Sequence, residues 1–293
     1  MPDPQTYALL DSGHGQKLEA FGPWRLQRPC AQAVWSPVLP KREWDAAHAK
    51  FTRRDGYQWQ MRTPLPESWE VRFDELRLQL KATDFGHLGV FPEQRDLWRW
   101  LTRTVSEAKR QRGQPVKVLN LFAYSGAATL AAARGGAEVC HLDAARGMVQ
   151  WARDNAARNH LDKAPIRWLV DDAMGFLERE QRRQRRYDAI IMHPPSYGHG
   201  AKGEVFEIAR DLPPMLEVCR ALMSEQPLWL LVAAHSPEFS PLGMRHVLGQ
   251  LFGDLGGEVG AGEISIRATP PALDIPSGVL GSWLAQGLPA LPL

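Results

Sequence analysis

The sequence predicts an α/β fold in which a mostly parallel, Rossmann-like sheet of seven strands follows a small β-rich N-terminal module. Three observations predict it. Strand-like and helical patterns alternate from residue 116 to residue 233, two further strand-like runs follow toward the C-terminus, and the first 92 residues show little helical pattern. Repeated strand and helix units of this length form parallel sheets with right-handed crossovers and helices on both faces.

Residues 1–92 are expected to form the β-rich module. Seven of the eleven tryptophans lie within the first 100 residues, and Pro and Gly punctuate short alternating runs. Residues 71–73 and 78–81 alternate like half-buried strands. Tryptophans in such a module belong to the core more often than to surfaces that stack on bases.

Residues 93–293 are expected to form the second domain, which opens with a helix over 93–108. Its apolar spacing predicts strands at 116–121, 138–142, 166–170, 187–192, 228–233, 263–268 and 278–284, the last of them antiparallel, and helices at 127–134, 146–159, 173–183, 212–223 and 241–252.

Composition excludes several classes of protein. A formal charge of +2 is too weak to argue for nucleic acid by itself. Cys30, Cys140 and Cys219 are scattered, without metal-ligand spacing, so neither a disulfide framework nor a metal site is expected, and a reduced cytoplasmic setting fits. The longest apolar stretch, 228–234, is too short to span a bilayer, and the N-terminus lacks a signal-peptide pattern, so no membrane association is expected.

The end of the first strand of the sheet is the first candidate site. Ligands of doubly wound sheets bind where the carboxyl ends of strands meet helix N-termini. Gly126 lacks a Cβ and would let the backbone approach a cofactor. The dinucleotide fingerprint GxGxxG is absent, which argues against NAD. The candidate cofactor-binding residues here are Phe122, Ala123, Tyr124, Ser125 and Gly126.

Acidic residues close the next two strands. Asp143 stands seventeen residues after Gly126, where a carboxylate accepts hydrogen bonds from both hydroxyls of a ribose. Asp172, followed by Ala173, is placed to accept a hydrogen bond from an adenine amino group. Either carboxylate could instead cap the helix that follows it, because Asp is favoured at that position.

The fourth strand ends in His193, Pro194, Pro195, Ser196 and Tyr197. Two consecutive prolines form a stiff turn whose carbonyls can accept hydrogen bonds from a substrate. Tyr197 could stack on a planar acceptor such as a base. A neutral His193 could act as a general base, with His235 as its partner. The alternatives are a structural proline turn and a histidine that only fills a hydrogen-bonding place.

Taken together, these motifs resemble the class I S-adenosylmethionine-dependent methyltransferases, and among them the bacterial 23S rRNA family that includes the large-subunit cytosine-5 enzymes. The terminal strand pair beyond five strand and helix units is also typical of methyltransferase sheets. The resemblance runs from about Asp84 to the C-terminus, and residues 84–94 look like that family's segment entering the domain beside the cofactor. It implies S-adenosylmethionine as the cofactor and RNA as the partner. It also implies a cofactor site made of Phe122 to Gly126, Asp143, Asp172, Ala173 and His193, and a catalytic loop made of His193, Pro194, Pro195 and Tyr197.

The chain departs from this family's pattern at the catalytic loop. Family members carry Asp-Pro-Pro-Lys-Phe where this chain has His193-Pro194-Pro195-Ser196-Tyr197. Cytosine-5 methylation needs a Cys thiolate that adds to C6 of the base. Neither residues 193–198 nor residues 233–237 contain a cysteine. The sequence therefore favours methyl transfer to a nitrogen or an oxygen of RNA, plausibly 23S rRNA.

Other functions stay open at this point. The weak net charge favours a small-molecule or protein methyltransferase on the same fold. A non-catalytic binder of the cofactor is a third reading, in which His193 marks a lost active site. A dehydrogenase is disfavoured because the fingerprint is missing. A measurement of salt dependence would distinguish an RNA methyltransferase from these alternatives, because RNA binding weakens steeply as the salt concentration rises.

Overall fold

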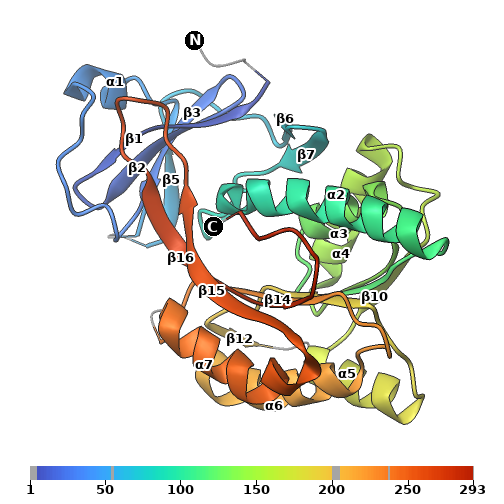
Figure 1. The fold of residues 1–293 in the computed structure, drawn as a ribbon. Helices are drawn as coiled ribbons and strands as arrows, with labels where there is room; N and C mark the ends of the chain where they lie inside the picture. The colour runs from blue at the N-terminus through green and yellow to red at the C-terminus, as the bar shows by residue number, and fades with distance from the viewer. Residues whose placement is uncertain (1–4, 54–55, 200–204, 237, 293) are drawn as a thin grey trace. The chain divides into compact units, whose positions relative to one another are not determined.

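The structure, a computed structural model, describes residues 5–53, 56–199, 205–236 and 238–292 (Figure 1). Two compact units divide the chain. The first is Met1–Arg95 with Ser265–Ser277, and the second is Asp96–Ile264 with Gly278–Leu293. The chain therefore passes between the units three times. The independent folding of residues 1–92 and 93–293 stays a prediction.

The second unit is built on a seven-stranded sheet with the order β10-β9-β8-β11-β14-β16-β15. The first five of these strands run parallel, and β16 pairs antiparallel with β14, which confirms the predicted fold class. The strands are β8 Lys117–Leu121, β9 Glu138–Asp143, β10 Ile166–Val170, β11 Ala189–Met192, β14 Trp229–Ala234, β15 Gly257–Ile266 and β16 Ile275–Ala285.

Helices cover both faces of this sheet. One face carries α2 (Arg95–Arg112), α3 (Ala127–Arg134) and α4 (Arg146–Arg158), and the other carries α5 (Ala173–Arg182), α6 (Ile208–Ala221) and α7 (Pro241–Phe252) (Figure 1). Short 3₁₀ turns, η1 Pro92–Gln94 and η2 Gly253–Leu255, flank α2 and α7. Ser240 caps α7 through the N–H of Gly243, and Pro241 occupies its first turn. Helix α6 begins four residues before its predicted start and contains Pro213 and Pro214.

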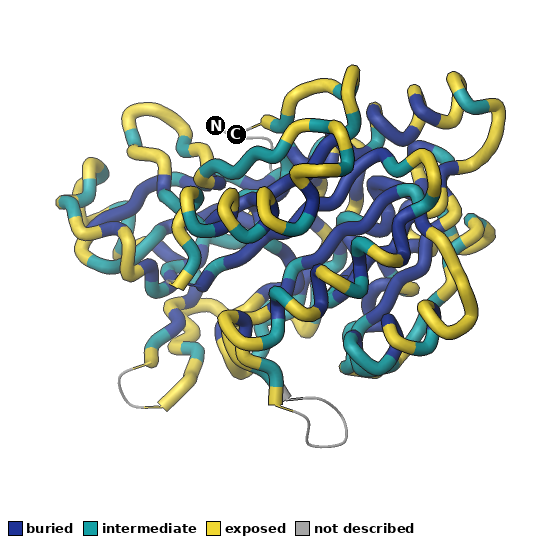
Figure 2. The backbone as a smooth tube through the Cα atoms, turned by 60° about the horizontal axis from the view of Figure 1, so that its bottom comes forward, coloured by how far each residue is buried: buried dark blue, intermediate teal, exposed yellow. Residues whose placement is uncertain are grey.

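The strands of this sheet are apolar because both of their faces are covered. Every residue of β11 and β14 is buried, and Figure 2 shows the buried colour following the strands while turns and outer helix faces stay exposed. Trp229 and Trp283 are the largest fully buried side chains. None of the described helices combines the length and apolar character needed to cross a bilayer.

The first unit is the predicted β-rich module. A five-stranded sheet in the order β1-β2-β3-β4-β5 is accompanied by the hairpin β6–β7 and the short helix α1 (Lys41–Asp45). The hairpin contains the two strands expected from alternation. The bounds are β1 Tyr7–Gly13, β2 Gln16–Phe21, β3 Trp24–Pro29, β4 Ala49–Thr52, β5 Gln58–Met61, β6 Trp69–Phe73 and β7 Leu76–Leu80.

The tryptophans of the first unit serve its packing. The indole N–H groups of Trp35, Trp44, Trp59 and Trp69 donate hydrogen bonds to other parts of the unit, at distances of 2.8 to 3.2 Å. Indoles tied down in this way hold loops and strands together. Their contacts support the structural role expected for them.

Candidate functional site

The predicted strand ends lie side by side at one edge of the sheet. Backbone hydrogen bonds connect them beyond the strands themselves: the Ala123 N–H donates to Leu142 O at 3.0 Å, the Asp171 N–H to Asp143 O at 3.2 Å and the His193 N–H to Leu121 O at 3.4 Å. The sheet thus brings together the four segments on which the candidate site was predicted. This edge is where doubly wound folds bind their ligands.

The loop after β8 has an unusual backbone. Phe122 and Tyr124 have positive φ angles of 53° and 52°, and Gly126 has a φ of 92°. Such values are costly for residues with a Cβ and concentrate at functional sites, where the surrounding structure imposes them. The loop therefore follows a path that its own residue types do not favour.

Asp143 holds this loop from the neighbouring strand. One carboxylate oxygen, Oδ2, accepts the Tyr124 N–H, and the other, Oδ1, accepts the Ala145 N–H, both at 2.9 Å. Burial raises the pKa of Asp143, against the lowering effect of these two donors. Helix α4 has Ala145 as its N-cap residue and no side-chain cap, so Asp143 is not a regular helix cap. Each oxygen keeps capacity for a further hydrogen bond.

Gly126 packs against helix α4. An added Cβ would lie 2.8 Å from the Cβ of Ala152. The space left by the missing side chain is therefore filled by the helix rather than open to a ligand, and Gly126 is needed for its left-handed φ and for this contact. Asn155, on the same helix, donates from Nδ2 to Ser125 O at 2.9 Å and fixes the loop further.

The acidic pair after β10 is engaged locally. Asp172 caps α5 by accepting the Gly175 N–H at 2.8 Å through Oδ2, the alternative role considered for it. Asp171 pairs with Arg179. The side chain of Ala173 is buried in the hydrophobic core, so only its backbone is available to a ligand. The second oxygen of Asp172 is the one that could meet an adenine amino group.

The proline turn after β11 leads into a small hairpin. Pro194 is buried, whereas Pro195 and Ser196 are exposed. Tyr197 begins β12 (Tyr197–His199), which pairs with β13 (Val205–Glu207), and its side chain is 58% exposed. An exposed ring at the start of a short hairpin is available to stack on a planar acceptor, as predicted for it.

His193 and His235 meet at the ends of β11 and β14. Their ring centroids lie 4.8 Å apart, with the planes tilted by 51°. Burial and then the neighbouring His235 hold the pKa of His193 well below its ordinary value. His193 is therefore neutral at neutral pH, the state in which an imidazole accepts a proton.

Comparisons with known proteins decide the family. The model of the S-adenosylmethionine-dependent methyltransferase family matches residues 38–226, well over half of the chain. The chain belongs to this family. The S-adenosylmethionine-dependent methyltransferase of Agrobacterium tumefaciens shares 39% identity and superposes with a TM-score of 0.91, covering 96% of this chain and 90% of that one.

Curated relatives are longer proteins. Ribosomal RNA large subunit methyltransferase K/L from Chromohalobacter salexigens is 30% identical over 235 residues, which are 76% of this chain and 31% of that protein. The enzyme of the same name from Marinobacter nauticus is 30% identical over 203 residues, 68% of this chain and 27% of that protein. The chain thus spans about a third of their length. The fold also matches the structure of SMU.776 in complex with SAH, at 19% identity and a TM-score of 0.76, covering 96% of this chain and 76% of that one.

The residues at the strand ends of this methyltransferase fit its cofactor. The half-buried carboxylate of Asp143 accepts hydrogen bonds from two backbone N–H groups, and ribose hydroxyls are suitable donors for its remaining lone pairs. Asp172 keeps one oxygen free of its cap. When bound, S-adenosylmethionine supplies an electrophilic methyl group on its sulfonium. The individual residue roles stay predictions.

Some supporting residues of the methyltransferase site were missed from the sequence. Asn155 and Ala152 position the glycine loop, and Thr129 links Asn120 and His141 in a buried chain of hydrogen bonds, each 2.9 Å long. A polar Asn in the buried stripe of α4 was the available signal, because a buried amide needs partners.

Proposed function

We propose that this chain methylates a nitrogen or an oxygen of an RNA nucleotide, with S-adenosylmethionine as the methyl donor and large-subunit ribosomal RNA as the first candidate substrate. The names of the curated relatives support the RNA substrate. Such a substrate also agrees with the cytoplasmic location expected from the cysteine content.

One observation carries the chemistry: all three thiols are buried, and none belongs to the segments 193–198 and 233–236 that end β11 and β14. Cys30, Cys140 and Cys219 are at most 8% exposed. Burial raises the pKa of Cys140 to about 11 and also raises the pKa values of Cys30 and Cys219. A nucleophile that must add to C6 of a cytosine has to be a thiolate at the acceptor. These cysteines do not meet that requirement.

Transfer to nitrogen or oxygen asks less of the protein. Holding the acceptor in line with the methyl group accounts for roughly 7 to 11 kcal/mol of barrier lowering in well-oriented reactions. The stiff Pro194-Pro195 turn would orient the nucleotide, and Tyr197 would stack on its base. A neutral His193 would accept the proton that leaves the methylated atom, since burial and then the neighbouring His235 lower its pKa.

Methyl transfer to RNA is the direct test. The protein is incubated with labelled S-adenosylmethionine and large-subunit RNA transcribed in vitro, and the digested nucleosides are identified by mass spectrometry. We expect one nucleoside methylated at a nitrogen or an oxygen. His193→Ala should reduce the rate by 10²-fold or more, whereas His246→Ala, at an exposed position of α7, should leave it unchanged. A 5-methylcytidine product, or no RNA methylation by protein that binds the cofactor, would contradict the proposal.

A further inference from the structure

Two large aromatic side chains of the first unit stand in solvent next to each other. Tyr57 is 61% exposed and Phe85 is 68% exposed, and their rings lie 6.4 Å apart in an edge-on arrangement. Tyr57 precedes the edge strand β5, and its ring also contacts buried Phe51. Single exposed apolar residues are ordinary, but two adjacent exposed rings form a local patch that suits a planar ligand.

The turn that carries Phe85 is held firmly. The Gly86 N–H donates to Thr83 O at 3.0 Å, and the Thr83 hydroxyl donates to His87 O at 2.8 Å. The indole N–H of Trp59 donates to the same Thr83 carbonyl at 2.8 Å. Hydrogen bonds among three residues of the turn, together with one from Trp59, thus fix the backbone on both sides of the exposed ring.

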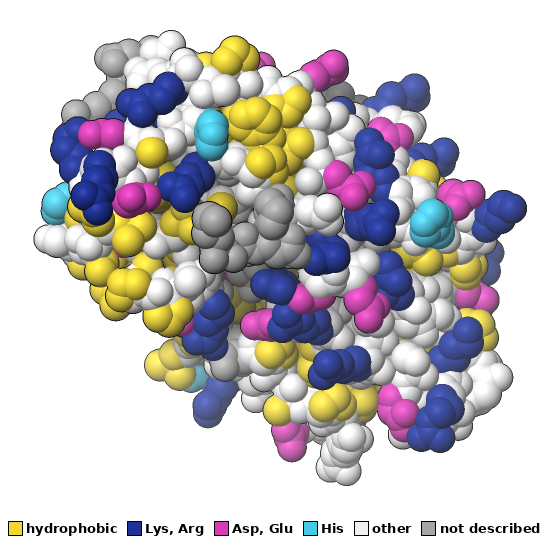
Figure 3. Space-filling model, turned by 90° about the horizontal axis from the view of Figure 1, so that it is seen from above, with side chains coloured by type: hydrophobic (Ala, Val, Ile, Leu, Met, Phe, Trp, Pro, Cys, Tyr) yellow, Lys and Arg dark blue, Asp and Glu magenta, His cyan; other side chains and the backbone are white. Residues whose placement is uncertain are grey.

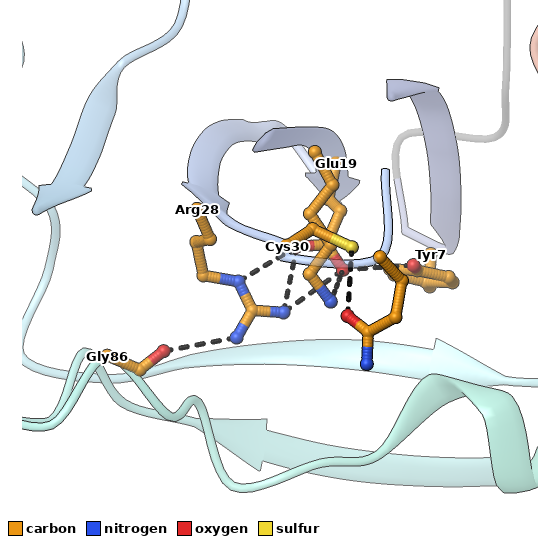
Figure 4. A network of polar contacts seen from close by, with 7 residues as sticks. Tyr7, Glu19, Arg28, Cys30 and Gly86 are labelled. Atoms are coloured by element: carbon orange, nitrogen blue, oxygen red, sulfur yellow. Dashed lines mark hydrogen bonds and ion pairs between the residues drawn. The ribbon is translucent and has the colours of Figure 1, made fainter. Parts of the chain in front are cut away.

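Beneath the turn, Gly86 fits against the ring of Phe51. Its φ is 77°, and an added Cβ would lie 2.5 Å from that ring. The Gly86 carbonyl accepts a hydrogen bond from Arg28 at 3.1 Å, and Arg28 is itself paired with buried Glu19 at 2.8 and 3.0 Å (Figure 4). Arg28, itself held by its ion pair with Glu19, thus fixes the carbonyl of Gly86, while the preceding residue, Phe85, is exposed to solvent.

Charged residues flank both rings in the sequence. Exposed Arg53 directly follows β4, and the sequence between it and Tyr57 holds Arg54 and Asp55. Asp84 is the acidic residue of the turn 83–87. On the face drawn in Figure 3, Lys and Arg side chains are mixed with Asp and Glu side chains. Exposed aromatic rings combined with basic side chains are how proteins take hold of single-stranded nucleic acid.

We propose that Tyr57 and Phe85 form a stacking platform for an unpaired base of RNA, with Arg53 meeting a neighbouring phosphate. The inference deepens the proposed function, since it rests on RNA as the substrate, and it assigns a binding role to the first unit. Stacking needs a flat ring that stays in place, which the anchored turn provides.

Binding of a fluorescein-labelled, unstructured 12-nucleotide RNA, followed by anisotropy, tests the platform. Tyr57→Ala with Phe85→Ala should weaken binding by roughly 10- to 100-fold. Val34→Ala, at an apolar position of the same unit that is 82% exposed, should bind like wild type. Phe85→Trp should retain binding and Phe85→Leu should lose it. Because a surface that docks an apolar protein segment would tolerate leucine, equal binding by the Leu variant would overturn the proposal.

Salt dependence separates the two kinds of contact. The slope of log K against log salt should stay at its wild-type value in the double Ala variant and become shallower in Arg53→Gln. Thermal unfolding checks that each variant is folded. If wild type methylates RNA while the double Ala variant binds RNA like wild type, the platform is wrong and the proposed function stands. If wild type methylates no RNA but the oligonucleotide binds through the two rings, the proposed function fails and the platform stands.

Discussion

Gly126 and Ala152 approach so closely that a Cβ on the glycine would lie 2.8 Å from the Cβ of the alanine. The contact joins the loop after β8 to helix α4, and with the Asn155 hydrogen bond to Ser125 it fixes the loop that Asp143 holds from the other side. The strand-end site is thus shaped by one helix and one carboxylate.

Gly126→Ala should therefore destabilise the protein. The new methyl group overpacks the contact with Ala152, and the left-handed φ of residue 126 is unfavourable for alanine. We therefore expect a loss of roughly 2 to 4 kcal/mol in the free energy of unfolding. Urea denaturation measures it. Gly147→Ala is the matched control, because Gly147 lies in α4 with nothing near its added Cβ, and it should stabilise by roughly 0.5 to 1 kcal/mol. Equal effects of the two substitutions would contradict the packing role.

Asp143→Asn should weaken cofactor binding. An amide in place of the carboxylate loses the charge and turns one acceptor into a donor that faces a backbone N–H. We expect S-adenosylhomocysteine to bind roughly 10- to 150-fold more weakly, the effect of losing a hydrogen bond to a charged group. Isothermal titration calorimetry measures it. Asp154→Asn, on the exposed face of α4, serves as the control. Unchanged affinity in the Asp143 variant would rule out the ribose role.

Asp172→Ser separates the two roles considered for Asp172. Serine caps helices about as well as aspartate, so the melting temperature should stay within a few degrees of wild type. Serine offers no second oxygen to an adenine amino group, so affinity for S-adenosylhomocysteine should fall by about tenfold. A variant with wild-type affinity would leave Asp172 with its capping role alone.

The sheet and the order of its strand ends could be predicted because each strand is a short apolar run, and the helix that follows it has apolar residues at helical spacing. Position in the chain then placed Asp143 and His193 at one edge. The support of Gly126 by Ala152 could not be predicted, because it depends on where α4 packs. The same holds for Ser265–Ser277, whose place in the first unit depends on pairing of Ala268 with Leu9. Sequence patterns describe local structure, whereas these contacts join distant segments.

His141 predicts a loss of stability in acid. Burial, and then Arg153, lowers its pKa to about 3 from an ordinary 6.5. The pKa of this histidine is lower in the folded protein than in the unfolded chain. Its neutral form therefore stabilises the fold at a pH above the pKa of the unfolded chain, and this contribution is lost as the pH falls from 6.5 toward 3. Between pH 7 and pH 5 the loss should be about 2 kcal/mol. Urea denaturation of wild type and His141→Gln at both pH values measures it. The difference in free energy of unfolding between wild type and His141→Gln should shrink by that amount from pH 7 to pH 5. An unchanged difference would contradict the lowered pKa of His141.

His193 and His235 predict the shape of the pH profile of methyl transfer. A base must be neutral, so activity is present above the pKa of His193 and is lost as the pH falls through it. Because burial and His235 depress that pKa, the rate of wild type should be flat from pH 6 to pH 8. His235→Asn removes the neighbouring imidazole, so the pKa of His193 should rise and the acid limb should move to higher pH. Rate profiles and NMR titration of the His193 ring measure both effects, with His246→Asn as the control. Identical acid limbs in wild type and His235→Asn would show that the two rings do not interact electrostatically, and His193 would then owe its neutrality to burial alone.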